Sequence, residues 1–260
     1  MSAAPDIRVS AVLIVKNEQD KLGECLASLA WADEIVVLDS GSHDETCAIA
    51  RAAGARVKTT IDWQGFGVQR QRAEALATGD WIFVIDADER VPPELAASIQ
   101  QAVLGGPAIY ELNRLSWCFG RYMRHTDMYP DWIPRLYPRG QAGFDETLVH
   151  ERLRNPAGLP VKRLTGDLLH EVYDSVGHLM RKSTLYAEHW AADRARRGQT
   201  ASLAGACLHG FASFIRMYVL RRGFLDGGPG LLIALVMSHA TFVKYADLWA
   251  RTRTSKRSND

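Results

Sequence analysis

Short apolar runs separated by helical patterns make up the first part of the chain. Runs rich in β-branched and aromatic residues cover Val9–Val15, Ile35–Leu38 and Trp81–Ile85, and a shorter strand is expected at Arg56–Thr59, nearer an edge. Continuous apolar runs of this length predict strands buried on both faces. Because helical patterns alternate with these strands, the order predicts an α/β fold with a parallel, doubly wound sheet and right-handed crossovers.

Spacing and end signals mark the helices between these strands. After the first strand, apolar residues recur at helical spacing at Leu22, Cys25, Leu26 and Leu29. Ser42 is followed three residues later by Glu45, a capping box that predicts a helix from there to Gly54. The segments Gly67–Ala77 and Pro93–Leu104 are predicted as two further helices.

The pattern changes after the break at residues 105–107. Short segments rich in aromatic residues, with Pro and Gly between them, run from Ile109 to Phe144 and predict a mixed, partly antiparallel sheet. From Ser175 the pattern is helical, with breaks at Gly198 and at residues 226–230. We therefore expect one domain at 1–174, with halves at 1–105 and 106–174, and a helical region at 175–260.

Polar residues directly follow three of the predicted strands. They are Lys16, Asn17 and Glu18 after the first strand, Asp39 after the second, and Asp86 and Asp88 after the strand that begins at Trp81. Open α/β sheets bind their ligands at the carboxyl ends of the strands, where these groups would meet. Their recurrence at three strands favours one nucleotide site in the first half over a set of unrelated solvated acids.

Asp86 and Asp88, one residue apart, favour a metal ion. Carboxylates this close repel each other unless a cation lies between them, and a divalent cation that carries phosphate oxygens meets that need. We expect Mg²⁺ or Mn²⁺ at Asp88, where it would neutralise the diphosphate of a nucleotide donor with help from Arg70 or Lys16. Asp86 would then contact the ribose, and Asp39 the base. A solvated helix arginine is an equal alternative for Arg70.

Some classes of enzyme are disfavoured. Neither a Gly-x-Gly-x-x-Gly sequence nor a Walker lysine motif follows the first strand, which argues against a dinucleotide oxidoreductase or a P-loop ATPase.

The second half offers a general base for an acceptor hydroxyl, as displacement at an anomeric carbon with inversion requires. We favour Glu151, which follows the apolar pair Leu148-Val149 and His150, with Glu146 and Glu171 as the alternatives. His170 is assigned a secondary role as a metal or phosphate contact, although a lone histidine is more often structural or exposed.

The composition indicates the cellular compartment and shows how charge is distributed along the chain. The chain has 260 residues, 47% of them apolar, and its four cysteines show no metal-ligand or redox spacing. With no signal-peptide pattern ahead of the first strand, a cytoplasmic setting is expected. Residues 181–257 carry 13 Lys and Arg against 4 Asp and Glu. This basic region suits an anionic surface, and we expect a membrane rather than nucleic acid.

The uncharged runs Gly198–Ile215 and Gly227–Val243 are interrupted by Gly, His, Ser or Pro. No transmembrane helix is therefore expected, and an interfacial helix is retained, with apolar insertion by the face of Leu231–Met237. Helices that pack on the domain, or on a second subunit in a homo-oligomer, are the equal alternative.

Three ordered motifs, residues 11–18, 37–46 and 77–89, resemble those of the inverting family 2 glycosyltransferases with the GT-A fold. Arg135-Leu136-Tyr137, Leu168-Leu169-His170 and residues 222–227 resemble the branch that adds a hexose to the lipopolysaccharide inner core, the core β-1,4-glucosyltransferase type. The resemblance implies base recognition by Asp39, a nucleotide and metal motif at Asp86 and Asp88, and a downstream acid as base. It also implies UDP-glucose as donor, a lipid-linked saccharide as acceptor, and a location at the cytoplasmic face of the inner membrane.

Two other functions use the same features. A nucleotidyltransferase has a similar sheet and metal but usually carries a Gly-rich, basic loop where this chain has Lys16-Asn17-Glu18. A catalytically silent membrane-surface scaffold would not need intact Asp86, Asp88 and Glu151.

Overall fold

The computed structural model describes residues 7–147, 151–173 and 175–257, and for 254–257 the backbone alone. The chain forms two compact units. Unit 1 contains the chain up to Arg114 together with Asp131–His170, and unit 2 contains Leu115–Pro130 and the chain from Glu171. The sequence placed the division at residue 174 and assigned all of 106–174 to the first domain, whereas Leu115–Pro130 belongs to the helical unit.

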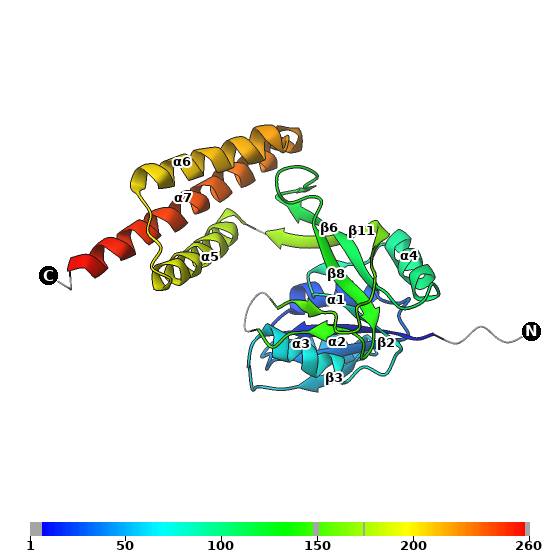
Figure 1. The fold of residues 1–260 in the computed structure, drawn as a ribbon. Coiled ribbons are helices and arrows are strands. Elements are labelled where there is room, and N and C mark those ends of the chain that lie inside the picture. Colours follow the sequence, from blue (N-terminus) through cyan, green and yellow to red (C-terminus); the bar gives the residue numbers. More distant parts are fainter. Residues whose placement is uncertain (1–6, 148–150, 174, 258–260) are drawn as a thin grey trace, which may run out of the picture. The chain divides into compact units, whose positions relative to one another are not determined.

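Unit 1 is built on one mixed sheet (Figure 1). Its strands are β1 (Val9–Val15), β2 (Glu34–Asp39), β3 (Arg56–Thr59), β4 (Trp81–Val84), β5 (Glu89–Arg90), β6 (Ile109–Cys118), β8 (Trp132–Pro138) and β11 (Val161–Tyr173), in the order β3-β2-β1-β4-β8-β6-β11-β5. The first four strands in that order are parallel, and β8 is antiparallel to β4. The expected sheet is therefore confirmed, including the edge position of β3.

Helices cover both faces of this sheet. They are α1 (Gln19–Ala27), α2 (Thr46–Ala52), α3 (Phe66–Glu74) and α4 (Pro93–Val103). Alternate residues of β1 point to opposite faces, so Leu13 joins a core with Leu22 of α1 and Leu95 of α4, while Val12 joins a second core with Ala73 of α3.

The predicted capping box of α2 is wrong. The helix begins at Thr46, its N-cap Glu45 makes no side-chain cap hydrogen bond, and Asp44 Oδ1 accepts a hydrogen bond from Thr46 N at 3.1 Å. Ser42 instead binds the loop after β1, because its Oγ accepts a hydrogen bond from Asn17 N at 2.8 Å. A side chain that bridges two strand ends competed successfully with the local cap.

The antiparallel half is longer than the sequence indicated. β6 extends to Cys118, and the 13-residue strand β11 was not predicted, although its last residues carry His170. A separate two-stranded ribbon joins β9 (Gly143–Phe144) to β10 (Leu153–Arg154). β11 was missed because its first part, Val161–Gly166, mixes basic and apolar residues without a clean period of two.

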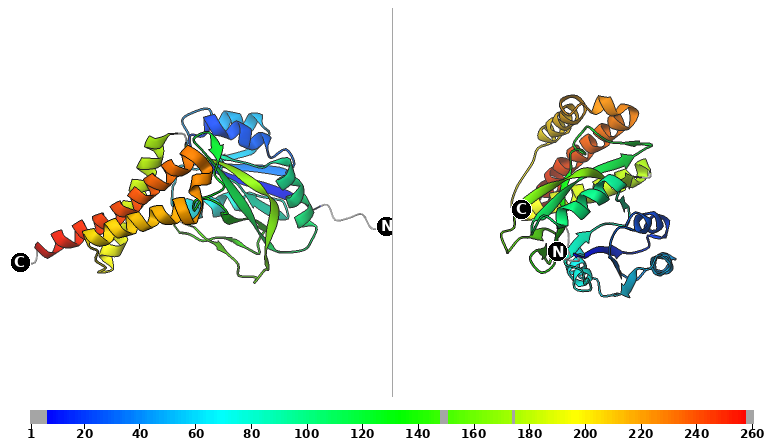
Figure 2. Two further views of the ribbon diagram at one scale, coloured as in Figure 1. Left: turned by 90° about the horizontal axis from the view of Figure 1, so that it is seen from above. Right: turned by 90° about the vertical axis from the view of Figure 1, so that its right-hand side faces the viewer.

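Unit 2 is mainly helical and contains α5 (Val176–Arg196), α6 (Leu203–Phe214), the π-helix η1 (Ile215–Leu220), the 3₁₀-helix η2 (Gly223–Asp226) and α7 (Gly227–Arg257). The short β7 (Arg121–Tyr122) pairs with the end of β6. α6 and α7 run antiparallel and side by side in every view (Figures 1 and 2). Their core includes Met217, Ile233 and Ala234, together with Met123 and Leu179.

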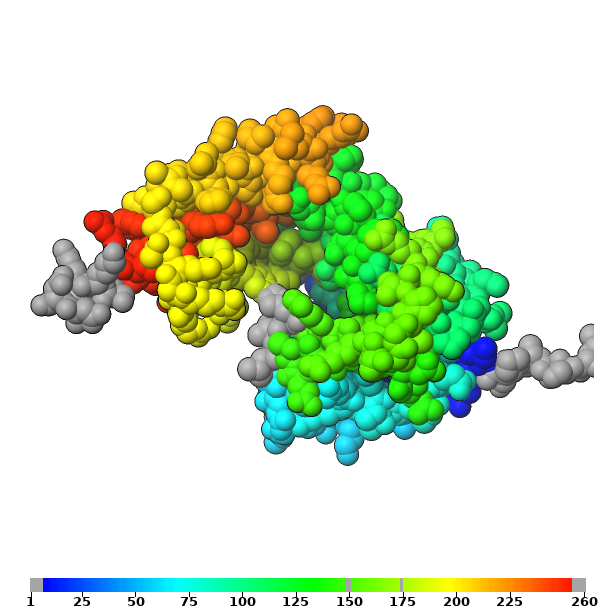
Figure 3. All heavy atoms as spheres, in the orientation of Figure 1, coloured from blue at the N-terminus to red at the C-terminus, as the bar shows by residue number. Residues whose placement is uncertain are grey.

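One expectation for unit 2 needs correction. Among the described residues, Leu203–Leu220 and Gly223–Arg253 are long and apolar enough, by length and composition, to cross a bilayer, because the helices continue through the Gly, Ser and His residues that were expected to interrupt them. Along Leu231–Met237, Ile233, Ala234 and Val236 are buried within the unit, whereas Leu231 and Leu235 are 38% and 51% exposed, so one side of this segment faces outward. α6, drawn yellow to orange, also lies at the surface (Figure 3).

Candidate active site

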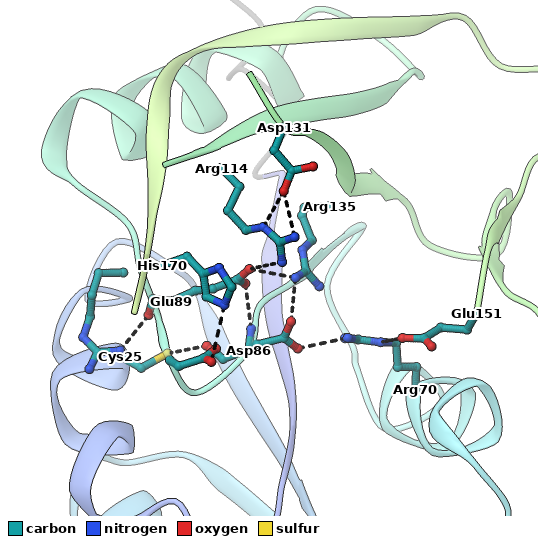
Figure 4. Close-up of polar contacts among 11 residues, drawn as sticks. Cys25, Arg70, Asp86, Glu89, Arg114, Asp131, Arg135, Glu151 and His170 are labelled. Atoms are coloured by element: carbon teal, nitrogen blue, oxygen red, sulfur yellow. Dashed lines mark hydrogen bonds and ion pairs between the residues drawn. The ribbon is translucent and has the colours of Figure 1, made fainter. Parts of the chain in front are cut away.

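Asp86, directly after β4, is the centre of the candidate site (Figure 4). Its Oδ1 lies 2.9 Å from Arg70 Nη2 on α3, and its Oδ2 lies 2.6 Å from Arg135 Nη2 on β8. Burial raises the pKa of Asp86, but the charges of Arg135 and Arg70 more than offset this and hold the pKa well below its usual range. Asp86 is therefore a carboxylate fixed between two buried guanidinium groups.

Glu89 extends this network into the protein. Its side chain is fully buried, its Oε1 lies 2.8 Å from Arg135 Nη2, and its Oε2 accepts a hydrogen bond from Asp86 N at 2.9 Å. Burial raises the pKa of Glu89, and the charge of Arg135 opposes that shift. Arg114 stands 3.7 Å from the same carboxylate and also pairs with Asp131 at 2.7 Å. These contacts fix the loop between β4 and β5.

Asp88 lies beside His170, with 3.4 Å between its Oδ2 and His170 Nε2. The β5–β11 ladder produces this proximity, because His170 pairs with Glu89 in the antiparallel register. Burial raises the pKa of Asp88, but the hydrogen bond and charge of His170 lower it below its usual value. The structure thus brings together the two residues that the sequence assigned to the metal.

Glu151 joins the site through Arg70. Its Oε1 accepts a hydrogen bond from Arg70 Nε at 2.8 Å, and its side chain is 14% exposed. Arg70 is therefore not a solvated helix arginine, because it is 7% exposed and links Glu151 to Asp86. His150, part of the same motif, lies outside the described residues.

The residues after β1 and β2 form a neighbouring network. Asn17 Oδ1 accepts a hydrogen bond from His43 N at 2.9 Å, and Asn17 adopts a positive φ of 55°. Asp39 accepts hydrogen bonds from Gly41 N at 3.2 Å and Ser42 N at 3.0 Å. Burial raises the pKa of Asp39, but these hydrogen bonds and those of the Ser42 and Cys47 side chains lower it below its usual value.

Glu18 and Lys16 differ in how close they come to the centre. Burial, and next the charge of Asp88, raise the pKa of Glu18, and Glu18 N donates a hydrogen bond to Thr46 Oγ1 at 2.8 Å. Lys16 is exposed. The predicted residues therefore separate into a central group of Arg70, Asp86, Asp88, Glu151 and His170, a neighbouring group of Asn17, Glu18 and Asp39, and the exposed Lys16.

Sequence reasoning assigned no role to Glu89 and Arg135. Both stood within quoted motifs, Glu89 directly after the Asp-x-Asp spacing and Arg135 at the start of Arg135-Leu136-Tyr137. The available signal was a pair of opposite charges inside apolar segments, where a charge without a partner is costly.

Three buried nitrogens of the site have no hydrogen-bond partner within the described part of the chain: Arg70 Nη1, Arg135 Nε and His170 Nδ1. Buried donors are normally satisfied, so the two arginine atoms favour an anionic or water-bridged ligand at this edge of the sheet. No group of three or more His, Cys, Asp or Glu side chains with metal-binding geometry occurs among the residues described here. Asp88 and His170 alone suit a divalent cation that takes its other ligands from phosphate and water.

A parallel sheet with acids at its carboxyl ends, joined to an antiparallel half that carries another carboxylate, defines a nucleotide-dependent transferase of the GT-A type. The chain belongs to glycosyltransferase family 2, since the model of that family, "Glycosyl transferase family 2", matches residues 10–159. This membership favours glycosyl transfer over nucleotidyl transfer.

Full-length relatives carry related names. An uncharacterized glycosyltransferase of Rickettsia felis is 28% identical and covers 93% of this chain and 89% of its own. The lipopolysaccharide core biosynthesis glycosyltransferase LpsC of Rhizobium meliloti is 27% identical over 98% of this chain and 97% of its own.

Matches to solved structures are shorter. Glucosyl-3-phosphoglycerate synthase from Mycobacterium tuberculosis, in complex with Mn²⁺, UDP and glucosyl-3-phosphoglycerate, is 30% identical with a TM-score of 0.36. The match covers 43% of this chain and 45% of that chain, so it spans less than half of the solved protein.

Proposed function

We propose that this protein transfers a hexose, glucose, from UDP-glucose to a saccharide of the lipopolysaccharide core, with inversion at the anomeric carbon. Family membership supports the reaction class, and the full-length similarity to a lipopolysaccharide core glycosyltransferase supports the class of acceptor. The donor and the inversion rest on the motif resemblance.

The observation that carries the proposal is the joint position of Asp86, Asp88 and His170. The two acids follow β4, which pairs with β1 in parallel, and His170 reaches Asp88 from β11. This is the edge at which a parallel sheet binds nucleotides. In the proposal Asp39 contacts the base, Asp86 the ribose, and Lys16, Asn17 and Glu18 line the donor site.

Asp88 and His170 would hold Mg²⁺ or Mn²⁺. A carboxylate and an imidazole are acceptable ligands for Mn²⁺, and Mg²⁺ is commonly bound through one or two carboxylates plus substrate phosphates. When bound, the cation supplies Lewis-acid neutralisation of the diphosphate. An aspartate is ionised at neutral pH, so the oxygens of Asp88 are available as ligands, and His170 would bind the cation as a neutral imidazole.

Glu151 and Arg70 would act on the two sides of the displacement. The acceptor hydroxyl gives its proton to Glu151 as its oxygen bonds to the anomeric carbon, and the bond from that carbon to the diphosphate oxygen breaks. Arg70 holds Glu151 Oε1 through Nε, so the other carboxylate oxygen is left for the acceptor. The unsatisfied Arg70 Nη1 can donate to the departing diphosphate.

The acceptor is proposed to be lipid-linked, which places the reaction at the cytoplasmic face of the inner membrane. No nucleic-acid partner is proposed.

A donor panel tests the proposal. UDP-glucose, UDP-galactose, ADP-heptose and GDP-mannose would be incubated with the protein and with deacylated core oligosaccharide, with Mg²⁺, Mn²⁺ or EDTA. We expect UDP release and one new β-linked hexose with UDP-glucose, lost in EDTA and in Asp88→Ala. Release of pyrophosphate would indicate nucleotidyl transfer, and turnover that is unchanged in EDTA and in Asp88→Ala would remove the metal site.

A further inference from the structure

α6 carries no charged residue, and its continuation η1 carries one, Arg216, while only one side of this helix packs within unit 2. The buried side carries Ala206, Gly210, Ser213 and Met217 at helical spacing. This side meets α7, where Ser238 Oγ donates to Gly210 O at 2.7 Å and Thr241 Oγ1 donates to Ser213 Oγ at 3.3 Å. Small residues allow this close contact, so the helix has one well-defined inner face.

The opposite side of this helix is exposed and apolar. Leu208, Phe211, Ile215 and Val219 recur at spacings of three, four and four, and Leu208 and Phe211 are 68% and 64% exposed. No charged residue occurs from Leu203 to Ile215. A helix that is hydrophobic all round is normally buried in a protein core or in a membrane.

The corner between η1 and η2 continues this exposed surface. Leu220 is 71% exposed, and Phe224 and Leu225 are each 49% exposed. Large apolar side chains at a turn are therefore presented to the surroundings, next to the exposed Arg221 and Arg222.

The corner has a rigid backbone. The fully buried Asp226 accepts hydrogen bonds from His125 N at 2.8 Å and from Arg124 N at 3.3 Å, and it lies 2.9 Å from His125 Nδ1. A Cβ on Gly230 would lie only 2.0 Å from Gly223 O, so the two segments are in direct backbone contact. The exposed apolar residues are thus held in place and do not belong to a frayed loop.

Cations and aromatic rings border the other end of α6. His209, next to Leu208, stacks on Tyr245 at 4.0 Å, and Tyr245 meets Trp190 at 4.9 Å. Lys244 and Arg194 lie over Trp190 at 5.0 and 4.9 Å. Within the described residues neither cation has a carboxylate partner. Trp and Tyr beside Lys and Arg are typical of the headgroup level of a membrane.

We propose that unit 2 binds an anionic phospholipid bilayer through the outer face of α6 and the η1–η2 corner, with the Trp190–Lys244 cluster at the level of the phosphates. The helix would lie in the interface, its apolar side chains among the upper acyl chains. The inference goes beyond the proposed function and does not depend on it, because it uses only residues of unit 2.

A second copy of this chain is a less suitable occupant of the face. Residues 181–257 contain four acidic residues. Asp226 is buried, Asp193 and Asp247 pair with arginines of their own helices, and Asp127 of the same unit pairs with Arg216 and Arg221. Two such faces would bring arginines and lysines together with few carboxylates between them, whereas an anionic bilayer supplies the opposite charge.

Flotation of the full chain with vesicles tests the proposal. Vesicles of phosphatidylcholine alone and with about a third phosphatidylglycerol would be used at low and high salt. We expect binding to the anionic vesicles at least about tenfold tighter than to neutral ones, weakened by salt without being abolished. Failure to float on anionic vesicles at low salt would overturn the proposal.

Matched variants locate the face. Leu208→Ser with Phe211→Ser should lower the partition coefficient about tenfold at both salt concentrations, whereas Phe211→Leu should retain binding. Lys244→Gln with Arg194→Gln should lower it about 20-fold at low salt and much less at high salt. The control pair Ile61→Ser with Leu104→Ser removes apolar side chains that are 85% and 59% exposed in unit 1. This pair should leave the partition coefficient unchanged.

Thermal unfolding by circular dichroism checks that each variant is folded, and release of UDP from the donor checks unit 1 separately. An equal loss of binding in the control pair would overturn the assignment of the face. Sedimentation in the absence of lipid tests for a dimer. If the Leu208 and Phe211 substitutions dissociate a dimer and leave flotation unchanged, the face binds a second copy of the chain and the membrane proposal is overturned.

Discussion

One carboxylate oxygen of Glu151 accepts a hydrogen bond from Arg70, and the other is left for the acceptor. The charge of Glu151 can therefore be removed without loss of the contact to Arg70. Glu151→Gln keeps an oxygen that can accept from Arg70 Nε but removes the basic group. We expect turnover to fall about 10²- to 10⁴-fold, the usual contribution of a positioned base, with UDP affinity little changed. Steady-state kinetics and calorimetric titration of UDP measure the two effects.

The exposed Glu146 supplies the control for this experiment, because it lies in the same segment and Glu146→Gln should retain turnover. If Glu151→Gln turns over like the unsubstituted protein, the base is a different carboxylate, and Glu146 and Glu171 are the next to test.

Arg135 is expected to contribute to stability as well as to the site. It is 6% exposed and bridges the half-buried Asp86 and the fully buried Glu89, so Arg135→Met leaves both carboxylates short of a partner. We expect a loss of about 3–5 kcal/mol in the free energy of unfolding, measured by urea denaturation at pH 7.

A double-mutant cycle separates this pairing from packing. Adding Glu89→Gln to Arg135→Met should restore part of the stability, because the carboxylate left without its arginine is replaced by a neutral amide. Strictly additive losses would show that the two side chains do not interact.

Asp39 makes the free energy of unfolding depend on pH, in the direction that its lowered pKa sets. Its folded-state pKa is lowered, so its contribution is present above the unfolded value of about 3.9 and is lost as pH falls through the folded value. Asp39→Asn should therefore cost about 1–3 kcal/mol at pH 7 and progressively less below pH 4. Urea denaturation of both proteins across pH 3 to 7 measures the difference, and a cost independent of pH would contradict the prediction.

At the scale of single residues, the sequence predicted positions better than partners. Asp86, Asp88 and His170 were selected because each lies at the end of an apolar run, and the structure brings them to one edge. The arrangement of Arg70 between Asp86 and Glu151 was not predictable, because it joins residues 81 positions apart through the side-chain geometry of α3. The same holds for Glu89 and Arg135, whose pairing needs the β4–β8 register.

At the scale of elements, α3 positions the segment that leads to Glu151. Gly67 N on α3 donates to Thr147 O at 3.2 Å, and a Cβ at position 67 would lie 1.9 Å from Asp145 O. Gly67→Ala therefore displaces this segment while Arg70 stays on the helix. We expect a loss of about 1–3 kcal/mol in stability and a larger proportional loss of turnover.

Gly23→Ala is the matched control for this prediction, because its added Cβ would meet only Ile49 Cγ2, at 3.9 Å, on another helix. Thermal unfolding and initial rates compare the two variants. Equal activity in both would show that contact between α3 and residues 145–147 is unnecessary for catalysis.

At the scale of the whole molecule, the parallel half was predictable because its strands are continuous and its polar residues fall at their ends. The antiparallel half was less predictable, since β6 continues beyond its apolar run and β11 begins in the charged sequence Val161-Lys162-Arg163. The grouping of Leu115–Pro130 with the helices left no local signal, because it depends on long-range contacts such as those of Asp226 with residues 124 and 125.

The β5–β11 ladder also has a consequence for synthesis of the protein. Glu89 and His170 face each other across 81 residues, so a ribosome must release the chain beyond β11 before Asp88 can meet its histidine. The parallel strands can pair much earlier, since β1, β2 and β4 are complete by Val84. Nascent chains that end before residue 170 should therefore have formed the sheet but not the pair, and closing so long a loop makes this a late step of folding.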